Sequence, residues 1–175
     1  MKKSLLTASI LAAGLAFSGA SQAVVVASST LNVSATVAVD CAVTTTAVNF
    51  GSLTATQYST ASGNVSVTCT TGTPYTITLD GGLNSPNTGT RSMKHSVDGV
   101  SLAVYALTSD IGLITPWGDS GFASTYPWGG GVADTSNGAA QPHPVYGQAS
   151  ATSPLTNLPS PAGVYSDTVN VTVNY

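Results

Sequence analysis

The chain has 175 residues, of which 42% are hydrophobic and only 6% are charged. The whole chain carries a net charge of −3. Without the lysines at positions 2 and 3, the basic residues are Arg91 and Lys94 against seven aspartates, and the net charge of the remainder is −5. Such a charge disfavours binding to nucleic acid or anionic lipid. The many Thr, Ser, Val and Gly residues instead predict a secreted all-β protein.

The first 23 residues, MKKSLLTASILAAGLAFSGASQA, predict a secretory signal peptide. Two lysines precede an apolar run from Leu5 to Phe17, and the small residues Ser21 and Ala23 fit a cleavage site. The run is short for a membrane span, and no charged stop follows it. Cleavage after Ala23 would leave 152 of the 175 residues, which is the size of one domain.

A long alternating segment opens the mature chain. Apolar residues fall on one face and mostly polar residues on the other: Leu31, Val33, Ala35, Val37 and Val39 against Asn32, Ser34, Thr36, Ala38 and Asp40. This period of two predicts a half-buried strand about 30 Å long. Its apolar face would promote aggregation if left exposed, so we expect it to be covered.

Short strands separated by turn residues are expected next. They are Ala47–Leu53 with a bulge at Gly51, Gly63–Thr70, Pro74–Asp80, and a hairpin of RSMKH and SLAVYALT around Asp98 and Gly99. In the second and third, Val65, Val67 and Cys69 share one face, as do Tyr75, Ile77 and Leu79. Several short strands and no long helical period predict a β-sandwich of immunoglobulin type.

Cys41 and Cys69 are the only cysteines, and in an oxidising compartment such a pair usually forms a disulfide. A metal site at these residues would need further Cys or His nearby, and that segment has none. On the chain-entropy model, closing this loop stabilises the fold by about 3–4 kcal/mol.

Residues 116–163 are rich in Pro and Gly and predict long loops around one or two short strands, one of them near VYGQAS. The chain then ends on a second alternating strand. Its apolar face carries Val169, Val171, Val173 and Tyr175, and its polar face carries Thr168, Asn170, Thr172 and Asn174. The mature chain is therefore bracketed by two such strands.

No catalytic, cofactor-binding or metal-binding motif stands out. His95 and His143 are the only histidines, Glu is absent from the mature chain, and the aspartates are scattered singly. We interpret both histidines as exposed loop or strand residues. The aromatic residues Trp117, Tyr126, Trp128 and Tyr146 could stack on sugars, but we expect them to pack over the end of the core.

Several motifs along the mature chain belong together. They are VSATVAVDCAV at the first cysteine, NFG at 49–51, VSVTCTTGTPYTITLDGG around the second cysteine, RSM at 91–93, VYALTSD, WGD at 117–119, HPVYGQ at 143–148 and AGVYSDTVNVTVNY at the end. With these motifs the chain resembles the spore coat protein U-like domain, the pilin subunit of archaic chaperone–usher pili.

This resemblance implies an incomplete immunoglobulin-like β-sandwich that a donor strand completes. In such pilins a periplasmic chaperone first fills a groove along the final strand, and at the outer-membrane usher the N-terminal strand of the next subunit replaces it. Residues 24–40 would be the donor segment, with Leu31, Val33, Ala35, Val37 and Val39 as donor side chains. Residues 41–175 would form the domain, with Val169, Val171, Val173 and Tyr175 lining the acceptor groove.

The partners implied are neighbouring pilin subunits, the chaperone and the usher, with no nucleic acid, small-molecule substrate or cofactor. The protein would travel through the periplasm to the fimbrium of a Gram-negative bacterium and serve in adhesion and biofilm formation. Three alternatives stay open from the residues. The two alternating strands could pair within one chain, the protein could be a spore or cell-surface coat component without an usher, or it could bind carbohydrate through Trp117 and Trp128.

Overall fold

The computed structural model describes residues 25–87, 89–123 and 130–175. The predicted signal peptide, residues 1–23, lies outside these residues. Contacts divide the chain between Thr36 and Val37, and the fold belongs to Val37–Tyr175. Every regular element in the described residues is a strand. Among them there is no helix long and apolar enough to cross a membrane.

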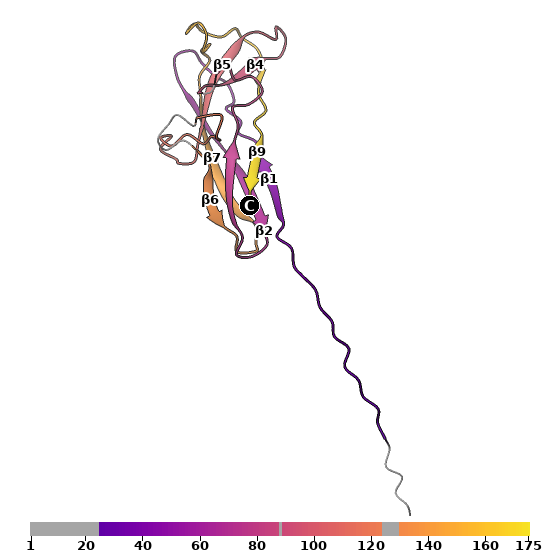
Figure 1. The fold of residues 1–175 in the computed structure, drawn as a ribbon. Coiled ribbons are helices and arrows are strands. Elements are labelled where there is room, and N and C mark those ends of the chain that lie inside the picture. Colours follow the sequence, from indigo (N-terminus) through magenta and orange to yellow (C-terminus); the bar gives the residue numbers. More distant parts are fainter. Residues whose placement is uncertain (1–24, 88, 124–129) are drawn as a thin grey trace, which may run out of the picture. The chain divides into compact units, whose positions relative to one another are not determined.

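Within residues 25–87, 89–123 and 130–175, nine strands form two sheets, and all pairings between them are antiparallel (Figure 1). The first sheet has the order β1 (Cys41–Thr46), β2 (Ser59–Cys69), β7 (Gln141–Ala149), β5 (Leu102–Thr108), β4 (Arg91–His95), β8 (Tyr165–Ser166). The second has the order β6 (Val132–Thr135), β3 (Pro74–Leu79), β9 (Val171–Asn174). The order therefore leaves β1 at the edge of one sheet and β9 at the edge of the other.

The core lies between the sheets and follows the predicted alternation. Val65, Val67 and Cys69 of β2 are at most 4% exposed, and the facing side chains of β3 are buried as deeply. Trp117 is buried among them, and its Nε1 donates to the carbonyl of Ile77 at 2.9 Å. The prediction that Trp117 packs in the core is confirmed.

The other aromatic residues that were expected to pack over the core do not share the environment of Trp117. Tyr146 lies in β7 and is half-buried. Tyr126 and Trp128 lie outside the described residues. The strand predicted near VYGQAS is confirmed as part of β7, which is longer than the motif.

The predicted hairpin is confirmed, since β4 pairs with β5 from Arg91↔Tyr105 to Lys94↔Leu102. Asp98 organises its turn, because its Oδ1 accepts the N–H groups of Val100 and Ser101, both at 2.9 Å. Hydrogen bonds from the Ser101 side chain and from these two N–H groups hold the pKa of Asp98 down to about 2.

The prediction that His95 is exposed is wrong. It is 9% exposed, and its Nδ1 accepts the N–H groups of Val97 and Asp98. Its Nε2 lies 3.3 Å from the carbonyl oxygen of Ala162. The ring therefore joins the β4–β5 turn to the loop before β8, a long-range contact with no local sequence pattern.

The predicted strand Ala47–Leu53 is also absent. This segment crosses the core, with Val48, Phe50 and Leu53 half-buried against it. Gly51 has φ +65° and donates its N–H to Asn49 Oδ1, so it forms a turn and not a bulge. Phe50 lies so close to β7 that a Cβ on Gly147 would sit 2.8 Å from its ring. The apolar residues alternate here although the segment is a loop, because one side of the loop packs against the core.

The predicted disulfide is confirmed. Cys41 and Cys69 are directly opposed at the first pair of the β1–β2 ladder, with Cα atoms 4.0 Å apart. The bond therefore fastens an edge strand to β2 at the point where the chain enters the domain.

We expect the double substitution Cys41→Ala and Cys69→Ala to lower the free energy of unfolding by about 3–4 kcal/mol, since it frees a loop of 28 residues. Urea unfolding of the mature chain, followed by tryptophan fluorescence, measures this. Reduction of the wild type should reproduce the loss. A change below about 1 kcal/mol would show that β1 is held without the bond.

Candidate functional site

The inner face of β1 is incompletely covered. In the antiparallel ladder Val43 stands opposite Val67, so both side chains point to the core face of the sheet. Val67 is 0% exposed, whereas Val43 is 42% exposed. The sandwich therefore covers the second strand of this sheet but leaves the core side of its edge strand open to solvent.

The inner face of β9 is also incompletely covered. Val171 stands opposite Leu79, and Val173 stands opposite Ile77. Leu79 and Ile77 are 2% and 0% exposed, but the two valines and Val169 before them are only half-buried. The three predicted valines thus share one partly covered apolar face.

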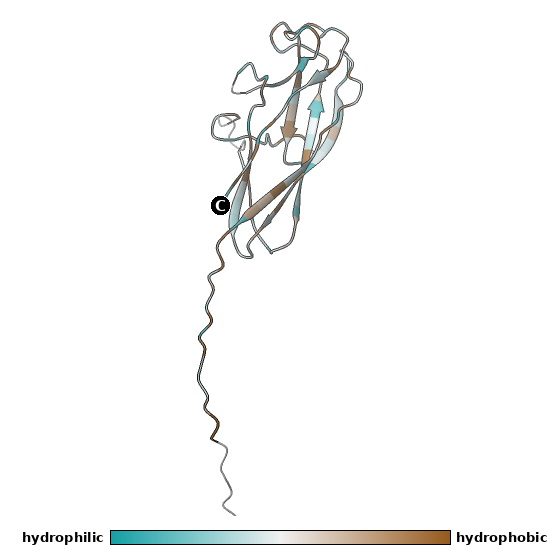
Figure 2. Ribbon diagram, turned by 90° about the vertical axis from the view of Figure 1, so that its right-hand side faces the viewer, coloured by the Kyte–Doolittle hydropathy of each residue, from teal (hydrophilic) through white to brown (hydrophobic). Residues whose placement is uncertain are grey.

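These two faces end different sheets. The C terminus, which follows β9, lies near the start of β1 in both views (Figures 1 and 2). No described strand joins β1 to β9. The side of the sandwich between them has inward-pointing apolar residues and two unpaired edges, which is the arrangement that one additional strand would complete.

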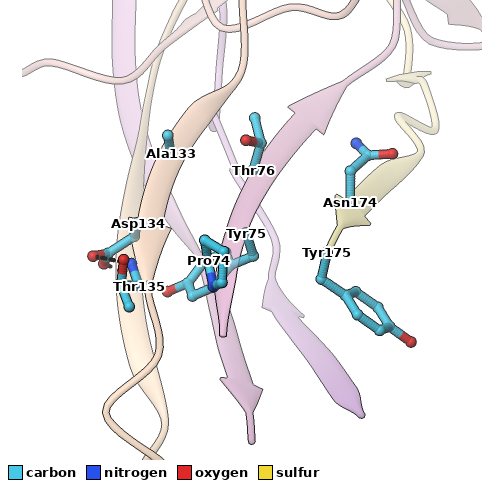
Figure 3. Close-up of a pocket in the computed structure, with 8 residues that line it drawn as sticks. All are labelled: Pro74, Tyr75, Thr76, Ala133, Asp134, Thr135, Asn174 and Tyr175. Atoms are coloured by element: carbon cyan, nitrogen blue, oxygen red, sulfur yellow. Dashed lines mark hydrogen bonds between the residues drawn. The ribbon is translucent and has the colours of Figure 1, made fainter. Parts of the chain in front are cut away.

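Tyr175, the fourth predicted groove residue, differs from the valines because it is 62% exposed. Its ring points away from β3 beside an open hollow lined by Pro74, Tyr75, Thr76, Ala133, Asp134, Thr135, Asn174 and Tyr175 (Figure 3). The hollow is wide open to solvent, unlike the clefts that bury most of a small ligand.

The predicted strand at the start of the mature chain is absent, since residues 25–40 include no strand. Leu31, Val33 and Val37 are more than 80% exposed, and Val39 is 56% exposed. A strand forms only with a hydrogen-bonded partner, so an alternating sequence alone does not make one. The segment combines an apolar face with backbone groups that have no ladder.

Asp80 fixes the backbone just before β9. Its two carboxylate oxygens accept the backbone N–H of Asn170 at 2.9 Å and the side-chain Nδ2 at 2.6 Å. Its own N–H donates to the carbonyl of Asn170. These three bonds hold Asn170 outward, so Val169 and Val171 on either side turn inward.

Asp167 anchors the same segment three residues before Asn170. One carboxylate oxygen accepts the hydroxyl of Tyr105 at 2.7 Å, and the other accepts Nδ2 of Asn84 at 2.8 Å. Gly82 must be a glycine here, because it has φ +80° and a Cβ would meet the Asp167 carboxylate. The chain entering β9 is thus fastened to both sheets.

Arg91 is a buried cation that hydrogen-bonds to the backbone next to Asp80. It is 2% exposed and donates to the carbonyls of Leu79, Asp80 and Trp117 at 2.6–3.0 Å. Its guanidinium carbon lies 4.3 Å from the centre of the Phe122 ring. The end of β3, which pairs with β9, is thereby held by a buried cation.

Burial shifts the pKa values of these groups. It lowers the pKa of Arg91 to about 10, against the favourable charges around it, and it raises the pKa of Tyr105 above its ordinary range. Burial alone would raise the pKa of Asp80. Hydrogen bonds from Asn170 and Gly82 outweigh that effect and place it below its ordinary value of 3.8.

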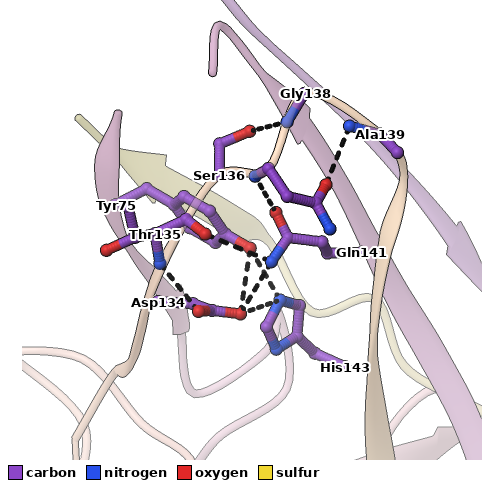
Figure 4. A network of polar contacts seen from close by, with 9 residues as sticks. Tyr75, Asp134, Thr135, Ser136, Gly138, Ala139, Gln141 and His143 are labelled. Carbon is purple, nitrogen blue, oxygen red and sulfur yellow. Dashed lines mark hydrogen bonds and ion pairs between the residues drawn. The ribbon is translucent and has the colours of Figure 1, made fainter. Parts of the chain in front are cut away.

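A second polar network joins the two sheets through residues of β3, β6 and β7 (Figure 4). The Tyr75 hydroxyl of β3 lies 2.9 Å from Nε2 of His143 in β7, and it donates to Asp134 of β6. Gln141 donates to the same carboxylate at 3.1 Å. The network therefore links the two sheets through hydrogen bonds. In the described part of the chain, no cluster of three His, Cys, Asp or Glu could hold a metal ion.

The family model described as Spore Coat Protein U domain matches residues 27–172, which is most of the chain. The chain belongs to this family. A comparison with curated proteins gave no match.

The Spore Coat Protein U domain is also similar in structure to a chain of the "CsuC-CsuE chaperone-tip adhesion subunit pre-assembly complex from archaic chaperone-usher Csu pili of Acinetobacter baumannii". The TM-score is 0.54 at 22% identity, and the match covers 80% of this chain and 41% of that chain. The chain therefore spans less than half of the solved chain, and the likeness shows the fold alone. The predicted all-β, immunoglobulin-like sandwich is confirmed.

Sequence reasoning missed the polar residues that position β9 in this Spore Coat Protein U domain. Asp80 and Asn170 are 90 residues apart, and Tyr105 and Asp167 are 62 apart. In the sequence each of these four residues is an isolated polar residue with no pattern that links it to its partner. The DGG turn at Asp80 indicated a turn, but nothing local indicated its partner.

We expect Asp80→Asn to destabilise the domain at neutral pH and to weaken its pH dependence. A carboxyl with a folded-state pKa below its unfolded value stabilises the fold above that unfolded value, and the contribution is lost as the pH falls through the folded-state pKa. Urea unfolding at pH 7 and pH 3 should show a loss of about 1 kcal/mol at pH 7, since the group is partly solvent-screened, and a smaller difference between the two pH values.

The control is Asn170→Ala, which removes the bond from Nδ2 to the Asp80 carboxylate and keeps the carboxyl and both backbone bonds. Adding Asp80→Asn to that variant should cost less than it does in the wild type. Equal pH dependence of the wild type and Asp80→Asn would contradict the role given to Asp80.

Proposed function

We propose that the protein is a structural, non-enzymatic subunit of a chaperone–usher pilus and that it polymerises by donor-strand complementation. One observation carries the proposal: Val43 and the β9 valines face the core opposite fully buried partners and yet remain partly exposed. A strand with apolar side chains at every second position would cover both faces and pair with both edges.

The donor is the N-terminal segment of another copy or of a related subunit. Residues 24–40 supply five apolar side chains at alternating positions, Leu31, Val33, Ala35, Val37 and Val39. The described part of this segment, residues 25–40, has no strand partner in this structure. The acceptor side chains are Val169, Val171 and Val173, with Tyr175 at the end of the face. Donation from copy to copy is head-to-tail and does not close, so it builds a filament.

The same exposed face explains the partners that the proposal requires. A subunit with uncovered apolar residues would aggregate in the periplasm, so a chaperone strand fills the groove until the usher exchanges it for the next donor. The protein would then reside in a fimbrium on the surface of a Gram-negative bacterium and contribute to adhesion and biofilm formation.

The structure weakens one of the alternatives. A carbohydrate-binding module that stacks sugars on Trp117 and Trp128 needs exposed rings, but Trp117 is 1% exposed and its Nε1 is already bonded to Ile77. A coat component that assembles without an usher would use the same exposed faces. Neighbouring genes for a chaperone and an usher would favour the pilus.

We expect Val33→Asp and Val37→Asp, on the apolar face of the donor segment, to abolish fibres. A carboxylate forced into an apolar groove costs several kcal/mol. Ser34→Asp and Thr36→Asp, on the polar face of the same segment, are the matched controls and should preserve fibres. Electron microscopy of sheared cell-surface material, with the cognate chaperone and usher present, measures the outcome.

Deletion of Val24–Asp40 behind an intact signal peptide should also stop polymerisation. The truncated subunit keeps its acceptor face, so it should still bind the chaperone. Fibres built from the truncated subunit alone would contradict the donor assignment.

A further inference from the structure

The three residues that precede β1 are bonded to their own domain. The Thr70 hydroxyl donates to the carbonyl of Ala38 at 3.2 Å and accepts the N–H of Asp40 at 3.1 Å. The N–H of Thr70 donates to the carbonyl of Asp40 at 3.0 Å, just beyond the first pair of the β1–β2 ladder. Residues 38–40 therefore continue the edge strand of the domain to which they belong.

Val39 lies within this bonded stretch. It stands two residues before Cys41, so the alternation of an extended chain places both side chains on the same face. Val39 is 56% exposed, whereas Val37 is 82% exposed. Val37 is thus the last apolar residue of the N-terminal segment that lies outside the stretch bonded to Thr70.

The part of the segment before these bonds matches the acceptor in length and pattern. Residues 31–37 and residues 169–175 both span seven residues, in which four apolar positions alternate with three polar ones. The apolar positions are Leu31, Val33, Ala35 and Val37 in the first stretch and Val169, Val171, Val173 and Tyr175 in the second. The polar positions are Asn32, Ser34 and Thr36 in the first and Asn170, Thr172 and Asn174 in the second.

The ends of the domain determine the direction in which a donor would run. The C terminus lies near the start of β1 in both views, so β9 ends where residues 38–40 enter the domain (Figures 1 and 2). A donor parallel to β9 would bring its own domain to that occupied end. An antiparallel donor brings its domain to the opposite end, beside Val169, and antiparallel is the direction of every pairing in the described residues.

The bonds to Thr70 exclude the deepest antiparallel register. If Val39 stood beside Val169, Ala38 and Asp40 would have to enter the neighbouring groove as well. Their bonds to the Thr70 hydroxyl and N–H would then break. Each lost bond costs stability unless the groove replaces it, so this register is disfavoured.

A register shifted the other way leaves apolar surface uncovered. With Ala35 beside Val169, Val37 would stay in solvent, and the polar Ser29 would stand beside Tyr175. The intermediate register, with Val37 beside Val169, covers every apolar position of both stretches. The hydrophobic effect therefore favours the intermediate register.

We propose that residues 31–37 of one copy insert antiparallel to β9 of the next copy, with Val37 beside Val169 and Leu31 beside Tyr175. This inference rests on the proposed function and narrows its donor, because Val39 stays with its own domain. Thr70 is the positioning residue that sets the register. On the outer face each polar donor residue then stands beside a polar residue of the acceptor, as in Asn32 with Asn174, Ser34 with Thr172, and Thr36 with Asn170.

Cysteine crosslinking in assembled fibres tests the register. The full chain, produced with its chaperone and usher, carries Ser34→Cys with Thr172→Cys. Directly opposed strand residues have Cβ atoms about 4.5–5.5 Å apart, close to the separation in a disulfide, whereas diagonal neighbours are about 7–8 Å apart. Oxidation should therefore join consecutive copies into a ladder on a denaturing, non-reducing gel. The native disulfide lies within one copy and contributes nothing to that ladder.

Two shifted pairs are the matched controls. Thr36→Cys with Thr172→Cys reports the register that inserts Val39, and Asn32→Cys with Thr172→Cys reports the opposite shift. Neither should form a ladder. A ladder from either control, or fibres in which none of the three pairs forms one, would overturn this register and leave the proposed function standing. Absence of fibres from the wild type would overturn the proposed function instead.

Substitution of Thr70 gives a second measurement. In the chain that carries Thr36→Cys and Thr172→Cys, Thr70→Val removes both hydroxyl bonds, so residues 38–40 can slip into the groove. The crosslinked fraction should rise about fivefold or more. Thr70→Ser keeps the hydroxyl and should leave the fraction low. An equal crosslinked fraction in the two variants would show that Thr70 does not set the register.

A third measurement needs no added cysteine. Val39→Asp should preserve fibres, in contrast to Val37→Asp, because its carboxylate stays outside the neighbouring groove. Electron microscopy measures the fibres, and copurification with the chaperone shows that the acceptor face is intact. Loss of fibres from a Val39→Asp subunit that still binds the chaperone would place Val39 in the groove and contradict the register.

Discussion

The organisation of this domain depends on the apolar side chains that its two edge strands direct into the core without a strand to cover them. Val43 opposes the fully buried Val67 and yet is 42% exposed, and the valines of β9 oppose buried residues of β3 in the same way. The hydrophobic effect favours covering these faces, and the unpaired backbone groups at both edges favour a strand as the cover. On the proposed function, assembly would complete the fold by supplying that strand.

An uncovered face can receive a strand only if it keeps its shape while empty. Asp80 and Asp167 fasten the chain that enters β9, and the disulfide fastens the first residue of β1. Arg91 holds the carbonyls at the end of β3 beneath them. The polar groups thus supply at the edges the rigidity that packing supplies elsewhere, because apolar contacts are missing on the open side.

Much of the fold could be predicted from the sequence where a strand has one buried face. In β3, Tyr75, Ile77 and Leu79 alternate with polar residues, and all three are buried as expected. Alternation failed at Ala47–Leu53, where a crossing loop also faces the core. It missed β1, whose sequence CAVTTT is mostly polar because it lies at an exposed edge. Alternation of apolar and polar residues indicates that one side of a segment is buried. It does not show that the segment is hydrogen-bonded to a neighbouring strand.

By itself, the sequence determined the two alternating segments, the cysteine pair, the family motifs and the absence of a catalytic pattern. These properties are local or compositional, so neighbouring residues are enough to express them. Only the tertiary structure decided that Asp80 meets Asn170, that His95 is buried, and that Ala38 and Asp40 are bonded to Thr70. Those contacts join residues tens of positions apart, and the path of the chain between them is set by the packing of both sheets.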